Sequence, residues 1–193
     1  MNGDVLPDLL RPGLRLVFCG TAAGTASARA KAYYAGSGNA FWEALHATGL
    51  TPELLAPEDF GRLPEFGIGL TDLCKVRHGS DAEVGTVEFD VDGLRSRLAA
   101  VEPGAVAFNG KNAARGALEE DVGYGLQEVQ LGGAATWVLP STSGAARRFW
   151  DIAPWQQLAS AVGCPPTLSD YAGSASSSPG QRPVSRLTPL RTP

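Results

Sequence analysis

Two stretches of small and hydroxyl-bearing residues offer the groups best suited to binding another molecule. The first, VFCGTAAGTAS, covers residues 17–27 and places Gly20 and Gly24 after an apolar run. The second, PSTSG, covers residues 140–144 and follows the apolar run AATWVL. Glycine tolerates positive φ, and small side chains let another molecule approach the main chain. Such loops can clamp phosphates with backbone N–H groups and hydroxyls.

Aromatic and amide side chains lie between these two stretches. Tyr33 and Tyr34 are adjacent, and Asn39 stands just before Phe41 and Trp42. A tyrosine ring can stack on a nucleobase, although Tyr34 could equally be part of the core. Asn39 could bind a ligand or simply cap the helix that follows it. The sequence leaves both pairs of alternatives open.

Several common catalytic arrangements are absent. The chain has no G-x-G-x-x-G, no H-E-x-x-H, and no Lys-Ser/Thr after its G-x-x-x-G stretch. The two histidines, His46 and His78, lie in neither loop, which disfavours a serine hydrolase. Three cysteines lie far apart without a C-x-x-C pair. We therefore expect neither a zinc site nor a disulfide framework.

Length and charge favour one domain followed by a tail. We expect a domain over residues 1–172 and a disordered Ser-, Pro- and Arg-rich tail over residues 173–193. The net charge is −4, yet residues 140–193 hold five arginines and two acids, so a local basic face could still engage phosphates. We find neither a secretion signal nor an apolar run of about 18 residues. These features predict a cytoplasmic protein that does not span a membrane.

Apolar runs alternate with helical patterns along the chain. Strands are expected at residues 14–18, 68–73, 105–108 and 134–139, with a loop at 74–89 and a loop at 28–38 that could begin as a helix. Helices are expected at 39–48, 91–102, 111–119 and 155–162, with another after residue 144. This alternation predicts an α/β fold, a central mostly parallel sheet with helices on both faces. Both small-residue loops follow strands, so they should share one edge of the sheet.

Five blocks along the chain resemble one known family. They cover residues 11–24, 39–42, 69–73, 108–111 and 137–147. In this order and spacing they resemble the mismatch-specific uracil/thymine branch of the uracil-DNA glycosylase superfamily, and the likeness covers about residues 6–150. The resemblance implies a monomeric DNA glycosylase without cofactor. Such an enzyme flips uracil out of duplex or mismatched DNA and hydrolyses its N-glycosidic bond, leaving an abasic site for base excision repair.

The resemblance also implies two sets of contact residues. In the expected base-binding set, Tyr34 stacks on the extruded base. That set is Gly20, Thr21, Ala22, Tyr34, Asn39 and Asn109. The expected DNA-binding set includes the last block, which enters the minor groove. That set is Gly24, Ser27, Lys111, Ser141, Ser143, Gly144, Ala145, Arg147 and Arg148.

This chain departs from the family pattern at three positions. Ala22 stands where an asparagine or acid usually positions the attacking water, and Ser141 replaces a histidine or asparagine. Ala145 replaces a leucine wedge, for which Arg147 or Arg148 could substitute. The candidate catalytic residues become Asn39, then Asp72 and Asp59.

Three functions fit these departures. The first is uracil excision. The second is binding of a lesion or abasic site with weak or no hydrolysis, and the third is a different hydrolase or nucleotide-binding domain using the same bare loop.

Overall fold

A five-stranded sheet forms the centre of the molecule. The computed structural model describes residues 3–86 and 88–163. The strands are β1 (Leu16–Ala23), β2 (Ile68–His78), β3 (Ala105–Asn109), β4 (Gly125–Leu131) and β5 (Ala134–Leu139). Their order is β2-β1-β3-β5-β4, and β4 runs antiparallel to β5, whereas the other neighbouring pairs are parallel.

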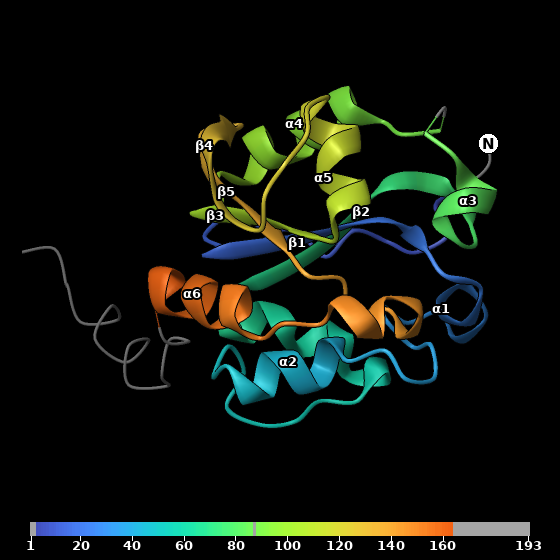
Figure 1. Ribbon diagram of the computed structural model, residues 1–193, viewed down its shortest axis with the longest axis horizontal. Coiled ribbons are helices and arrows are strands. Elements are labelled where there is room, and N and C mark those ends of the chain that lie inside the picture. The colour runs from blue at the N-terminus through green and yellow to red at the C-terminus, as the bar shows by residue number, and fades with distance from the viewer. Residues whose placement is uncertain (1–2, 87, 164–193) are drawn as a thin grey trace, which may run out of the picture.

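Helices cover both faces of this sheet, as Figure 1 shows. On one face lie α4 (Val91–Val101) and α5 (Lys111–Leu118), and on the other lie α2 (Phe41–Ala47) and α6 (Ala153–Val162). Short helices complete the fold: α1 (Thr25–Ala30), η1 (Pro57–Phe66), α3 (Asp81–Val84) and η2 (Gly144–Phe149). The predicted α/β fold with a mostly parallel sheet is confirmed.

Two hydrophobic cores account for this layering. Adjacent residues of β1 feed opposite cores, with Phe18 on one side and Val17 on the other. Phe18 packs against Phe41 of α2 and Trp155 of α6. Val17 belongs to the cluster that includes Leu98 of α4. A strand buried on both faces has a nearly continuous run of apolar residues in its sequence, which is why the buried part of β1 was readily predicted.

The element boundaries differ from the prediction in several places. β1 continues through Gly20 to Ala23 instead of turning after residue 18, and α1 begins at Thr25 within a stretch expected to be irregular. The predicted loop over residues 74–89 is wrong, because β2 extends to His78 and α3 follows. β4 was not predicted. The expected tail over residues 173–193 and the domain boundary at residue 172 lie outside the described residues.

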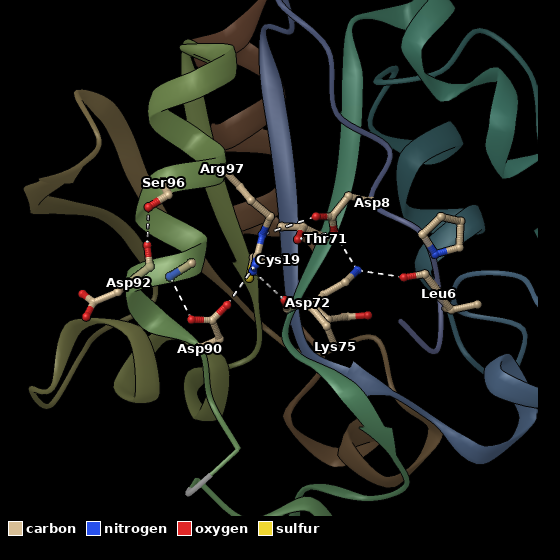
Figure 2. A network of polar contacts seen from close by, with 12 residues as sticks. Leu6, Asp8, Cys19, Thr71, Asp72, Lys75, Asp90, Asp92, Ser96 and Arg97 are labelled. Carbon is tan, nitrogen blue, oxygen red and sulfur yellow. Dashed lines mark hydrogen bonds and ion pairs between the residues drawn. The ribbon is translucent and has the colours of Figure 1, made fainter. Parts of the chain in front are cut away.

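A buried polar network fastens the N-terminal segment to β2. Asp8 accepts hydrogen bonds from Lys75 Nζ at 2.6 Å and Thr71 Oγ1 at 2.7 Å. Its other carboxylate oxygen lies 3.3 Å from Arg97 Nε of α4. Figure 2 shows this cluster, in which one carboxylate lies between two cations.

Among the described residues, no helix has the length and apolarity to cross a membrane.

Candidate active site

A cavity of about 720 Å³ opens at the carboxyl ends of the parallel strands. Both small-residue stretches contribute to it, so the prediction that they share one edge of the sheet is confirmed. Residues of the predicted sets that line the cavity are Gly20, Thr21, Ala22, Gly24, Ser27, Tyr34, Asn39, Asp72, Asn109, Lys111, Ser141, Ser143, Gly144 and Ala145. Ligands of open α/β sheets bind in this place.

Asp72 and Gly20 meet in the wall of this cavity. They are register partners on the parallel strands β2 and β1. A Cβ atom at position 20 would lie 2.5 Å from Asp72 Oδ1 and 3.7 Å from the Tyr34 hydroxyl oxygen. The Asp72 carboxyl therefore occupies the space that a side chain at position 20 would need. This contact explains why a glycine stands within a strand.

Asp72 is a buried acid whose carboxyl forms no hydrogen bond or ion pair with any residue in the described part of the chain. Its side chain is 4% exposed. Burial raises the pKa of Asp72 to about 7, and the negative charge of Asp8 adds to this, while Lys75 and Arg97 oppose it. Lys75 and Arg97 pair with Asp8, and Arg97 Nη2 donates only to the backbone carbonyl of Asp72. Asp72 thus remains available to another molecule.

Tyr34 lies between the core and the cavity. Its ring stacks on Phe41 with centroids 3.8 Å apart and an interplanar angle of 20°. Its backbone has a φ of 54°, a left-handed conformation that non-glycine residues rarely adopt. The buried hydroxyl oxygen has no hydrogen-bond partner among the described residues. Burial raises the pKa of this phenol, so it stays protonated and can donate a hydrogen bond to a ligand.

The two asparagines connect the cavity wall to its loops. Asn109 Nδ2 donates to Thr142 Oγ1 at 2.8 Å, and Asn109 Oδ1 accepts from the Thr142 N–H at 3.0 Å. Asn39 Oδ1 accepts from the Phe41 N–H, the first of α2, at 3.1 Å, although the N-cap residue of α2 is Ala40 and not Asn39 as the capping alternative had it. The Ala40 N–H donates to the Thr142 carbonyl at 2.9 Å. Thr142 therefore fixes the loop over residues 140–144 against both β3 and α2.

Hydroxyls around the cavity are largely engaged within the protein. Ser27 is buried and its Oγ accepts from the N–H of Ala35, the residue after Tyr34, so it helps to hold the backbone at Tyr34. Ser141 and Ser143 bond to each other through their hydroxyl oxygens at 3.3 Å. Ser27 thus stabilises the site from within, whereas Ser141 and Ser143 remain partly exposed in the cavity wall.

Sequence reasoning missed a carboxylate at the cavity mouth. Asp81 of α3 accepts hydrogen bonds from Thr21 Oγ1 at 2.5 Å and from Asn112 Nδ2 at 2.6 Å. These bonds hold α3 beside the end of β1. Asp81 lies in the stretch that was expected to be a loop, and only the tertiary fold brings its two partners to it.

Three predicted residues do not line the cavity. Asp59 lies in η1, where its carboxylate accepts from the N–H of Ala56, the residue just before the helix, and it is not in the cavity lining. Arg147 lies against Gly38, and Arg148 lies over the ring of Phe149 at 4.6 Å. The described residues contain no group of three or more His, Cys, Asp or Glu side chains placed to hold a metal ion.

Two comparisons with known proteins agree with this geometry. The family model described as the Uracil DNA glycosylase superfamily matches residues 7–159. A solution NMR structure of a Methanosarcina acetivorans protein, proposed there to be a uracil DNA glycosylase, is similar to this chain with a TM-score of 0.59 and 27% sequence identity. That similarity covers 78% of this chain and 92% of the other.

Proposed function

Because this chain belongs to the uracil DNA glycosylase superfamily, we propose that it excises uracil from DNA by hydrolysing the N-glycosidic bond without a covalent intermediate. The observation that carries the proposal is the unpaired, buried carboxyl of Asp72 in a cavity of about 720 Å³. Excision from DNA requires a pocket for a flipped base and a group that handles the attacking water. In this proposal the cavity is the pocket for the base, and Asp72 is the group that handles the water.

The chemistry assigns Asp72 to the water. As the bond between C1′ of the sugar and N1 of uracil breaks, its electron pair leaves with the base and positive charge grows on the sugar. Water adds to C1′ and gives its proton to Asp72, which a carboxylate with a pKa of about 7 can accept at neutral pH. The negative charge of Asp72 also stabilises the developing sugar cation. The departing uracil anion takes up a proton, so the products are free uracil and an abasic site.

Asp72 has the polar side chain, able to hold a water molecule, that Ala22 lacks. The alanine side chain at position 22 of β1 cannot hold water, although Ala22 lines the cavity. Asp72 comes instead from the neighbouring strand, and its carboxyl lies over Gly20, two residues before Ala22. Donors for the base oxygens are the Tyr34 hydroxyl and the amide of Asn109, both in the cavity lining. Asn39 is the weaker catalytic candidate because its amide oxygen caps α2.

Release of free uracil from a labelled oligonucleotide tests the proposal directly. We expect Asp72→Asn to release uracil about 10²–10⁴ times more slowly than the wild type, the usual contribution of a general base. Asp59→Asn is the matched control and should keep the wild-type rate, since Asp59 lies outside the cavity lining. Wild-type rates in the Asp72→Asn protein would refute the assignment of Asp72. Absence of release by the wild type would refute glycosylase activity.

The alternative function is binding of a lesion or abasic site without hydrolysis, and the alanine at position 22 favours it. The same assay separates the two functions when binding is measured beside release. A binding protein would retain uracil-containing or abasic DNA and release no base. Asp72→Asn would then leave the affinity for this DNA unchanged, and neither protein would release free uracil.

A further inference from the structure

Two exposed aromatic rings lie at the cavity and have no part in the proposed hydrolysis. Tyr124, in the segment before β4, is 43% exposed, and Phe149, at the end of η2, is 59% exposed. Both line the same cavity as Gly20 and Asp72. Neither ring forms an aromatic contact with another ring in the described part of the chain. Two large, partly exposed rings thus lie at one cavity without another aromatic ring against them.

Each ring is accompanied by a cation. Lys111 Nζ lies 4.6 Å from the centroid of the Tyr124 ring, and the Arg148 guanidinium lies 4.6 Å from that of Phe149. Neither Lys111 nor Arg148 forms an ion pair within the described residues. In a chain of net charge −4, this places unneutralised positive charge beside apolar rings. Rings paired with cations in this way bind unpaired nucleic acid, because bases stack on the rings and phosphates meet the cations.

The remaining mouth residues do not suit a stacked duplex. A nucleotide that leaves a duplex leaves a gap, and proteins commonly fill such gaps with a bulky apolar side chain. Gly144, Ala145 and Ala146 line the cavity with very small side chains. An unpaired strand has no such gap to fill, and its bases can unstack from one another and stack on the two rings.

We propose that Tyr124 and Phe149 are stacking platforms for the bases on either side of the uracil, so that the preferred substrate is uracil in an unpaired DNA strand. This inference rests on the proposed function, narrows its substrate and assigns the two rings a role in binding. Lys111 and Arg148 meet the phosphates of the same strand. The carboxylate of Asp81, which also lines the cavity, is held by Thr21 and Asn112 on the α3 side of the mouth.

Binding of an uncleavable strand tests the inference without relying on catalysis. The probe is a fluorescent single-stranded oligonucleotide carrying 2′-fluoroarabinouridine, whose fluorine slows cleavage of the glycosidic bond. A duplex of the same oligonucleotide is the second probe. We expect the wild type to bind the single strand more tightly than the duplex. Tyr124→Ala and Phe149→Ala should each weaken single-strand binding roughly five- to a hundredfold, as expected for the loss of one base–aromatic stack.

Controls separate this inference from a general effect of exposed apolar residues. Leu126→Ala removes a side chain that is 61% exposed and outside the cavity lining, so it should leave affinity unchanged. Phe149→Trp keeps a stacking ring and should bind like the wild type. Unchanged single-strand affinity in both alanine variants would overturn the inference, as would a loss confined to duplex DNA, which would make Phe149 a wedge. If the rings prove necessary for single-strand binding but no uracil is released, the rings keep their role in binding, and both the hydrolytic function and the assignment of a uracil substrate fail.

Discussion

Replacing Asp8 by asparagine should lower the pH at which the enzyme gains activity. Asp8 is not in the cavity lining, but its charge neutralises Lys75 and Arg97 beside Asp72. Asp8 also repels the Asp72 carboxylate and so helps to raise its pKa. Asparagine removes this repulsion and leaves the two cations without that counter-charge. The pKa of Asp72 should therefore fall, so that its ionised form is populated at a lower pH.

The size and sign of the shift follow from the same contacts. The pKa of Asp72 is about 7 in the native protein. Loss of one screened charge in its neighbourhood changes the free energy of ionisation by about 1.4 kcal/mol, or about one unit of pKa. Because the proposed base is the carboxylate form of Asp72, uracil release should rise with pH around 7 in the wild type and around 6 in Asp8→Asn. Single-turnover release measured from pH 5 to pH 9 gives both midpoints.

Dividing each rate by the folded fraction measured at the same pH keeps the test valid if Asp8→Asn lowers stability. Carbon-13 NMR of the Asp72 carboxyl gives the same pKa without DNA. Asp92→Asn is the control, since it removes an acid that is paired with Arg95 and has a side chain 95% exposed. A midpoint that stays at 7 or moves upward in Asp8→Asn would refute this electrostatic account. A wild-type rate that falls with pH would refute Asp72 as the base.

Three further predictions concern stability and steric fit. Burial raises the pKa of Asp72 from 3.8 to about 7, so ionisation of Asp72 destabilises the folded protein. This destabilisation is close to zero near pH 4 and reaches about 4 kcal/mol above pH 7. In urea unfolding, Asp72→Asn should therefore be more stable than the wild type at pH 8 and differ little from it at pH 4. Gly20→Ala should slow uracil release about 100-fold by displacing that carboxyl, whereas Gly61→Ala, outside the cavity lining and with nothing within 4 Å of its new Cβ atom, should keep the wild-type rate. Thr142→Val should cost about 1 kcal/mol of unfolding free energy by removing the acceptor of Asn109 Nδ2, and a loss near zero would show that this hydrogen bond does not hold the loop.

Much of the fold could be predicted because its central strands are apolar and buried on both faces. The end of β2 could not, since Lys75 is a charged residue that indicated a loop. In the fold its side chain is 7% exposed and pairs with Asp8, far away in the sequence. β4 was missed for a related reason. It is the edge strand next to β5, and most of its side chains reach solvent, so no apolar run marks it.

The site was predictable where residue type alone determines the role, and not where tertiary contacts do. The sequence indicated the two small-residue stretches and included Asp72 and Asp59 among the catalytic candidates, but it placed Asn39 ahead of both. Burial against Gly20 and location in the cavity distinguish Asp72 from Asp59. The roles of Tyr124 and Phe149 depend on both rings lying at one cavity, which their spacing in the chain does not reveal.

Folding stability alone gives no reason to keep an unpaired carboxyl at position 72. Two cations lie nearby, yet both pair with Asp8, so Asp72 stays poised near neutral pH while it lowers the stability of the native state. A general base that works near pH 7 needs such a pKa, and functional sites commonly carry a stability cost of this kind. The two pH experiments are therefore linked. The gain in stability of Asp72→Asn should grow from about pH 4 and level off near pH 7, the pH at which wild-type uracil release should be half-maximal. A gain that levels off well away from the midpoint of uracil release would show that the group titrating during catalysis is not Asp72.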